Sequence, residues 1–206
     1  MTTNWPTNKQ WILRKRPEGD ISAEDLAFID APVRDLEDGE VLVRNIYLSL
    51  DPTNRILMSD QDLYLPPVAL GEVMRGGTIG VVEASRSGRF QPGDLVNPGL
   101  GGWQAYTIGH EDAVNPVPSL PGIPLTAFMS VLGATGLTAY FGLMDIGKPQ
   151  PGETVVVSAA AGAVGSIVGQ IAKLKGCRVI GIAGGPDKCR WLVEELGFDG
   201  AIDYKS

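Results

Sequence analysis

The chain has 206 residues, 44% of them hydrophobic and 20% charged, with a formal net charge of −7 at pH 7. Such a composition can bury a core, and its acidic balance argues against binding to nucleic acid or to an anionic membrane surface. No stretch approaches the roughly 20 apolar residues of a membrane span, and residues 1–6 lack the apolar core of a signal peptide, so a cytoplasmic location is expected.

Histidine and cysteine are scarce in this sequence, which contains only His110, Cys177 and Cys189. Two cysteines do not make a disulfide framework, and we expect both to be packing residues. A catalytic zinc normally takes three protein ligands from His, Cys and carboxylates. The sequence therefore predicts no metal site, and His110 is expected to be a surface loop residue.

The N-terminal part of the chain alternates short apolar runs with Gly and Pro turns. The predicted strands are residues 11–14, 27–29, 40–48, 77–84, 94–96 and 103–108. Within 40–48, Val41 and Val43 share one face and Leu42 and Arg44 the other, so one face is expected to be only partly buried. Many short strands at close spacing predict a compact antiparallel barrel.

The pattern changes after residues 116–118. Residues 125–143 carry apolar side chains around most of a helical circumference, and Gly133 and Gly136 interrupt them. This predicts two helices or one broken helix. A domain boundary follows from the change in pattern, and it divides the chain into residues 1–124 and 125–206.

A buried strand, a tight turn of small residues and a helix are predicted next. The β-branched run at 155–157 has no polar alternation, which suits a parallel strand covered on both faces. Ala160-x-Gly162-x-x-Gly165 has the spacing of the dinucleotide fingerprint, with Ala at the first tight turn. Gly162 would let a pyrophosphate approach, Gly165 would let helix and strand pack closely, and the free N–H groups of the helix favour a phosphate.

The alternative is an ordinary parallel crossover, but a second strand at 178–183 completes a βαβ unit and favours nucleotide binding. An NAD-preferring site usually has an acidic residue about 20 residues beyond the fingerprint. Ala183, Gly184 and Gly185 stand there instead, and Lys188 follows within a turn. This favours NADP, although Lys188 at a helix start is also typical of a solvated lysine.

The last predicted elements are a helix closing over 191–196 and a third strand at 200–203. A doubly wound sheet normally continues to about six strands. We therefore expect exposed apolar sheet and helix faces. The chain is expected either to pair with another copy, as a homodimer, or to be an incomplete product with little activity.

Separated motifs agree, in order, with one known family. They are residues 47–52 (YLSLDP), 71–77 (GEVMRGG), 136–140 (GLTAY) and the glycine-loop segment 151–177. Over essentially its whole length the chain resembles the zinc-independent medium-chain dehydrogenase/reductases, in the branch of prostaglandin and leukotriene reductases, alkenal double-bond reductases and curcumin reductases. The resemblance implies an α/β protein with a GroES-like barrel in 1–124 and the first part of a Rossmann doubly wound parallel sheet in 125–206.

The resemblance also implies NADPH as cofactor and a role for particular residues. Gly162, Ala163, Val164 and Gly165 would hold the pyrophosphate, Lys188 and Tyr204 the 2′-phosphate and its ribose, and Thr138, Asn54 and Met129 would lie near the nicotinamide. Tyr64 would stand at the substrate cleft, and its alternative is an aromatic side chain half packed in a proline-rich loop. Many relatives have Tyr after Asp-Pro where this chain has Thr53, so that tyrosine's role is not transferred.

The implied reaction is reduction of the C=C bond of an α,β-unsaturated ketone or aldehyde. Hydride would pass to the β-carbon, and the resulting enolate would be protonated at the α-carbon. The growing charge on the carbonyl oxygen needs a donor, which could be the ribose 2′-hydroxyl, a backbone N–H or Tyr64. Two alternatives stay open: a quinone reductase of the same superfamily, and a catalytically silent NADP-binding or assembly module.

Overall fold

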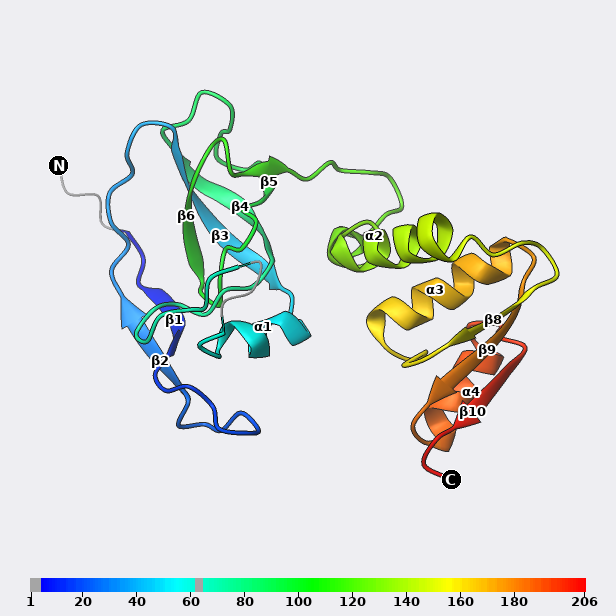
Figure 1. The fold of residues 1–206 in the computed structure, drawn as a ribbon. Coiled ribbons are helices and arrows are strands. Elements are labelled where there is room, and N and C mark those ends of the chain that lie inside the picture. The colour runs from blue at the N-terminus through cyan, green and yellow to red at the C-terminus, as the bar shows by residue number, and fades with distance from the viewer. Residues whose placement is uncertain (1–4, 62–64) are drawn as a thin grey trace. The chain divides into compact units, whose positions relative to one another are not determined.

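The computed structural model of the protein describes residues 5–61 and 65–206 (Figure 1). The chain divides into two compact units, Met1–Gly122 and Ile123–Ser206. The sequence placed the division after residue 124, close to this point.

In its described residues, 5–61 and 65–122, the first unit consists of antiparallel strands and one short α-helix. β1 (Asn8–Leu13) pairs with β2 (Leu26–Ala31) in a two-stranded sheet. A five-stranded sheet has the order β6-β3-β4-β5-β7. Its strands are β3 (Glu40–Leu48), β4 (Thr78–Ser85), β5 (Leu95–Asn97), β6 (Tyr106–His110) and β7 (Asn115–Pro116), and α1 (Pro52–Leu57) follows β3. This curled, wholly antiparallel arrangement confirms the predicted fold of the N-terminal domain.

β3 is an interior strand of the five-stranded sheet and is buried more completely than its sequence predicted. Val41, Leu42 and Val43 are all 0% exposed, so both faces are covered at the start of the strand. β3 pairs with both β4 and β6, so neither of its edges is free, and Val41 and Val43 pack in a buried cluster with Val82, Phe90, Val96 and Val114. From Arg44 onward one face is exposed, and only there is the prediction of a partly buried face correct.

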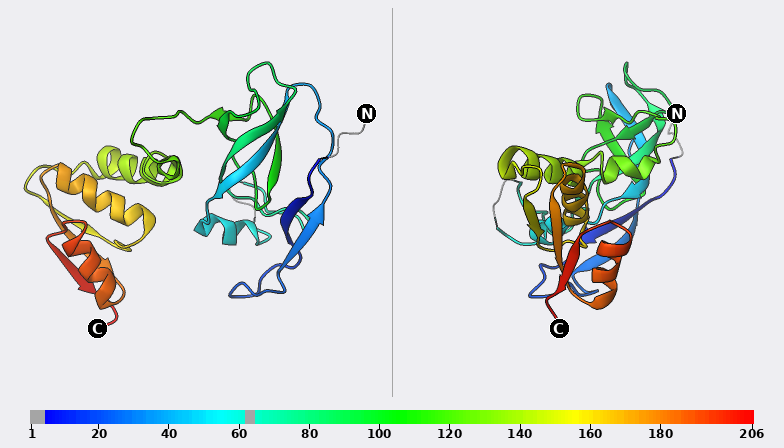
Figure 2. Two further views of the ribbon diagram at one scale, coloured as in Figure 1. Left: turned by 180° about the vertical axis from the view of Figure 1, so that it is seen from behind. Right: turned by 90° about the vertical axis from the view of Figure 1, so that its right-hand side faces the viewer.

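The second unit contains a parallel sheet with the order β10-β9-β8. The strands are β8 (Thr154–Val157), β9 (Arg178–Ala183) and β10 (Gly200–Asp203), and the helices α3 (Ala163–Leu174) and α4 (Pro186–Glu194) connect them. Figure 2 shows these alternating strands and helices from two further directions. The predicted βαβ unit is confirmed, and each strand has the connection to its neighbour that a Rossmann sheet requires.

The segment before β8 is a broken helix, which is one of the two predicted forms. It comprises a 3-10 turn η1 (Leu125–Met129), the helix α2 (Ala134–Phe141) and a π-helical turn η2 (Gly142–Gly147). Gly133 marks the break, but the prediction that Gly136 also interrupts the helix is wrong. Gly136 lies inside α2, where a Cβ would stand 1.8 Å from the carbonyl oxygen of Val131. Glycine is needed there for close packing.

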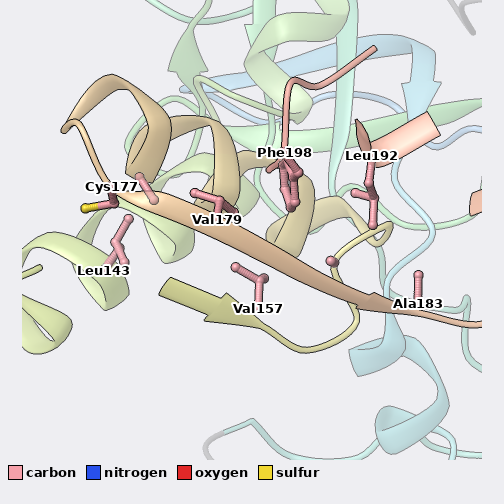
Figure 3. Packing of buried hydrophobic residues seen from close by; sticks show 9 residues of the cluster. Leu143, Val157, Cys177, Val179, Ala183, Leu192 and Phe198 are labelled. Carbon is pink, nitrogen blue, oxygen red and sulfur yellow. The ribbon is translucent and has the colours of Figure 1, made fainter. Parts of the chain in front are cut away.

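The helices cover one face of the parallel sheet. Figure 3 shows the buried cluster along β9. Its members are Leu143, Val157, Ala160, Ala172, Cys177, Val179, Ala183, Leu192 and Phe198. On the opposite face, Val156 is 59% exposed and Ile202 is 51% exposed. The prediction that both faces of the strand at 155–157 are covered does not hold for the described residues, whereas the expected exposure of an apolar sheet face is observed.

Candidate functional site

The turn between β8 and α3 is built by small residues. Ala159 adopts the left-handed conformation, with φ of 48°, which costs roughly 1–2 kcal/mol for a residue with a Cβ. Ala160, the position that the fingerprint assigns to the first tight turn, is instead fully buried, and its N–H donates to the carbonyl oxygen of Ile182 at 3.0 Å. The strained turn therefore lies one residue earlier than the sequence predicted, and Ala160 anchors the loop to β9.

The two glycines of the loop have different surroundings. A Cβ at Gly165 would stand 2.4 Å from the carbonyl oxygen of Ala159 and 2.9 Å from Cα of Ala160. Gly165 thus has the close-packing role predicted for it. A Cβ at Gly162 would meet only the oxygen of Ala159, at 3.1 Å, with nothing else within 4 Å. The space above Gly162 is open, which is what the approach of a phosphate to the backbone requires.

The start of α3 presents unused hydrogen-bond donors beside this open space. The first intrahelical bond runs from Ser166 N–H to the carbonyl oxygen of Gly162, at 3.0 Å. Within the described residues, the N–H groups of Ala163, Val164 and Gly165 have no acceptor, and Gly162 provides no side-chain cap. Unpaired N–H groups and the positive end of the helix dipole favour an anion here. The four residues predicted to hold the pyrophosphate thus lie together and fit that group.

A second cluster lies where β9 and β10 end. The Oδ1 atom of Asp203 accepts hydrogen bonds from the N–H of Gly185 at 2.8 Å and from the N–H of Lys205 at 3.0 Å. These backbone donors lower the pKa of the Asp203 carboxyl. The N–H of Tyr204 donates to the carbonyl oxygen of Ala183 at 3.2 Å. The turn after β10 is therefore attached to the turn after β9.

The residues predicted at the 2′-phosphate belong to this corner of the second unit. Lys188 is an exposed residue in the first turn of α4, directly after the turn at Gly185. Tyr204 is 66% exposed, and its Oη would be 2.8 Å from a Cβ at Gly184. The nearby carboxylate of Asp187 already pairs with Arg190 at 3.1 Å. An exposed lysine and a phenol hydroxyl beside a glycine turn can bind a phosphate.

The residues predicted near the nicotinamide belong to different units. In the second unit, Met129 ends η1, half-buried, and exposed Thr138 donates its hydroxyl to the carbonyl oxygen of Ala134 in its own helix, at 2.8 Å. In the first unit, Asn54 is buried in α1. Its Oδ1 accepts from the N–H of Asp51 at 2.6 Å, and its Nδ2 donates to the carbonyl oxygen of Arg75 at 2.8 Å. The amide of Asn54 thus caps α1, and its cofactor contact stays a prediction.

Tyr64, the predicted catalytic residue, lies outside the described residues, and its role stays a prediction. Among the residues that are described, no group of three or more His, Cys, Asp or Glu side chains is arranged to hold a metal ion. His110 ends β6, exposed, with its Nδ1 3.3 Å from Oδ2 of Asp112. In the described part of the chain, none of the helices has the length and apolar character needed to cross a membrane.

Comparison with known proteins identifies the family. Residues 9–117 match the model of the N-terminal domain of oxidoreductase. The chain is 48% identical over 197 residues to the NADPH-dependent curcumin reductase of Escherichia coli (strain K12), covering 96% of this chain and 56% of the relative. The chain belongs to the medium-chain dehydrogenase/reductases, in the curcumin and prostaglandin reductase branch.

Other members of this reductase branch are similar over the same span. Prostaglandin reductase 1 of Bos taurus is 41% identical over 200 residues, covering 96% of this chain and 58% of the relative. The crystal structure of CurA from Vibrio vulnificus in complex with NADPH has a TM-score of 0.90 and 47% identity, covering 96% of this chain and 58% of that one. The chain thus spans less than two thirds of the length of these relatives, and the predicted combination of GroES-like and Rossmann folds is confirmed.

Sequence reasoning did not find Asp203 or Lys205. It had pointed to this corner through residues 183–185, Lys188 and, by the resemblance, Tyr204. Asp203 could have been suspected because it ends a strand whose neighbour is followed by Gly184 and Gly185, so a carboxylate there can reach free backbone N–H groups. The role of Lys205 depends on where the chain turns, which the sequence does not indicate.

Proposed function

We propose that this chain belongs to an NADPH-dependent reductase that acts on the C=C bond of α,β-unsaturated ketones and aldehydes. The observation that carries the proposal is the anion site above Gly162, where the N–H groups of Ala163, Val164 and Gly165 are free. The printed names of two relatives support the chemistry, since one is an NADPH-dependent curcumin reductase and the other a prostaglandin reductase. A small-molecule substrate and a cytoplasmic homodimer are part of the same proposal.

The residues of this chain bind and orient the cofactor. The N–H groups at the start of α3 hold the pyrophosphate, and Gly165 keeps the helix close enough to the loop for them to converge. Lys188 and Tyr204 bind the 2′-phosphate of NADPH. Residues 183–185 provide no carboxylate for the ribose hydroxyls of NAD, so NADPH is preferred. When bound, NADPH supplies the hydride that reduces the β-carbon. The proposed hydrogen-bond donor to the carbonyl oxygen of the substrate is the ribose 2′-hydroxyl, a backbone N–H or Tyr64.

Turnover of the purified protein tests the reaction. NADPH oxidation is followed by nicotinamide absorbance with a long-chain enone, an alkenal and a simple quinone. Faster turnover with the enone or alkenal than with the quinone supports the proposal, and the reverse order favours the quinone reductase. Binding of NADPH without turnover of any of the three favours the silent binding module. Light scattering coupled to size-exclusion chromatography measures whether the protein is a dimer.

A further inference from the structure

Tyr204 and Lys205 lie together over the backbone of Gly184. A Cβ atom at Gly184 would stand 2.8 Å from Oη of Tyr204 and 3.0 Å from Cε of Lys205. Both side chains therefore fold back across the turn after β9 instead of extending away from it. Because Gly184 has no side chain, a hydroxyl and a cation fill the stretch in which an NAD-preferring site has its acidic residue.

Asp203 holds this arrangement in place through the backbone. A single oxygen, Oδ1, accepts from the N–H of Gly185, which opens α4, and from the N–H of Lys205. The N–H of Tyr204 adds a bond to Ala183, the last residue of β9. Asp203 is thus bonded to Gly185 and Tyr204 to Ala183, and the N–H of Lys205 is bonded to Asp203, so the backbone that carries the Lys205 side chain is attached to the turn after β9.

The charges in this corner leave two lysines for an anion. Asp203 accepts hydrogen bonds from backbone donors and also attracts Lys205 without forming an ion pair with it, and Asp187 pairs with Arg190. Within the described residues, neither Lys188 nor Lys205 forms an ion pair, and both are exposed. A phosphate monoester carries about −1.5 to −2 charges at pH 7, so one lysine would leave a 2′-phosphate only partly neutralised.

We propose that Lys205 is a second cation for the 2′-phosphate of NADPH, beside Lys188, and that Asp203 is the positioning residue that holds Lys205 over Gly184. The inference rests on the proposed function, because it needs an NADP-type cofactor on the glycine loop. Lys205 contributes selectivity for the phosphorylated ribose, and Gly184 is required because any side chain there displaces both Lys205 and Tyr204.

The test measures binding of adenosine 2′,5′-bisphosphate and of AMP by calorimetry, because these probes need only the adenosine end of the site. Lys205→Met removes the charge and keeps the apolar stem, and we expect it to weaken binding of the bisphosphate about tenfold with AMP unchanged. Lys205→Arg keeps the charge and should retain most of the affinity. Lys175→Met, at the exposed end of α3, makes the same charge change elsewhere and serves as the control.

Further variants separate position from charge. Asp203→Ala should reduce bisphosphate affinity severalfold, whereas Asp203→Asn, which keeps an Oδ1 acceptor, should largely restore it. Gly184→Ala should also weaken bisphosphate binding while leaving the unfolding temperature nearly unchanged, because the displaced atoms are the ends of exposed side chains.

Wild-type affinity for the bisphosphate in Lys205→Met would overturn this inference and leave the proposed function standing. A wild-type protein that binds the bisphosphate no better than AMP would overturn both the inference and the NADPH assignment. The two failures are therefore distinguishable.

Discussion

At the scale of single residues, the site depends on three glycines, which have no Cβ atom. Gly162 leaves space for a ligand, Gly165 allows the helix to touch the loop, and Gly184 leaves room for Tyr204 and Lys205. Substitution of each of these glycines by alanine is therefore expected to have a different effect, because the added Cβ would meet different neighbours. Ala159 shows the opposite case, a residue with a Cβ held in a left-handed conformation by the loop around it.

Replacement of the loop glycines should separate stability from binding. Gly165→Ala forces a Cβ against the backbone of Ala159, and we expect it to lower the free energy of unfolding by about 2 kcal/mol. Gly162→Ala meets only one atom at 3.1 Å, so it should change stability little and weaken NADPH and NADH binding alike, since both have the pyrophosphate. Urea unfolding and fluorescence titration measure the two quantities. Equal loss of stability in both variants would contradict this assignment.

Lys188 should affect only the phosphorylated cofactor. Lys188→Ala is expected to weaken NADPH binding about tenfold and to leave NADH binding unchanged, because only NADPH has the 2′-phosphate. Fluorescence titration with each cofactor gives the two dissociation constants, with Lys175→Ala as the matched control. If both affinities fall equally, Lys188 does not recognise the 2′-phosphate.

At the scale of elements, α3 is held to the sheet by a contact between a glycine and a ring. A Cβ at Gly169 would stand 1.9 Å from Cζ of Phe198, so the helix rests directly on this buried side chain. The same ring approaches Gly181 of β9, where a Cβ would be 3.1 Å from it. Phe198 therefore fixes the distance between α3 and β9, and with it the position of the helix N-terminus at the site.

Gly169→Ala should lower the free energy of unfolding by about 2–3 kcal/mol through overpacking. Gly142→Ala is the control, because its Cβ would meet nothing within 4 Å in a helical conformation, and it should be neutral or slightly stabilising. In the double variant Gly169→Ala with Phe198→Leu, the smaller side chain should make the two effects less than additive. Strict additivity in urea unfolding would show that the contact is not the cause.

At the scale of the whole molecule, the chain contains separate cores. Val41, Val43 and Val82 belong to a cluster of the first unit, and Val179 and Leu192 belong to that of the second. Units with their own cores can unfold in separate transitions. Trp5, Trp11 and Trp103 lie in the first unit and Trp191 in the second. Tryptophan fluorescence in a Trp191→Phe background therefore reports on the first unit alone.

The tryptophan fluorescence of the first unit makes the pH dependence of its stability measurable. Two hydrogen bonds from Arg34, at 2.6 and 2.7 Å, lower the pKa of the Glu40 carboxyl from 4.5 to about 2. Because the folded-state pKa is lowered, the stabilisation is fully present above about pH 4.5 and is lost as the pH falls toward 2. Arg34 is about half exposed, so the contribution should be on the order of 1–2 kcal/mol.

The difference in free energy of unfolding between the wild type and Glu40→Gln measures this contribution. It should be constant from neutral pH to about 5 and should shrink steadily in more acidic solution. Because every other carboxylate is common to both proteins, their titration cancels in the difference. A difference that does not change with pH would show that the ion pair contributes nothing.

Much of the site was determined by the sequence alone. The spacing from Ala160 to Gly165, between an apolar strand and an apolar-faced helix, specifies a strand, turn and helix through local steric rules, and these hold in any surroundings. The absence of an acidic residue from 183 to 185 is likewise a property of the sequence. Local patterns could not place the left-handed residue, because Ala159 and Ala160 have the same side chain.

Only the tertiary structure decided which side chains meet. Asp203 and Lys205 are about twenty residues from Gly184 and Gly185 along the chain, and parallel pairing of β9 with β10 brings their ends to one edge of the sheet. Burial at the start of β3 likewise depended on residues distant in the sequence, because Val41 and Val43 pack with Phe90, Val96 and Val114. Periodicity reports which residues share a face, but contacts between distant segments are set by strand order and register, which no local pattern encodes.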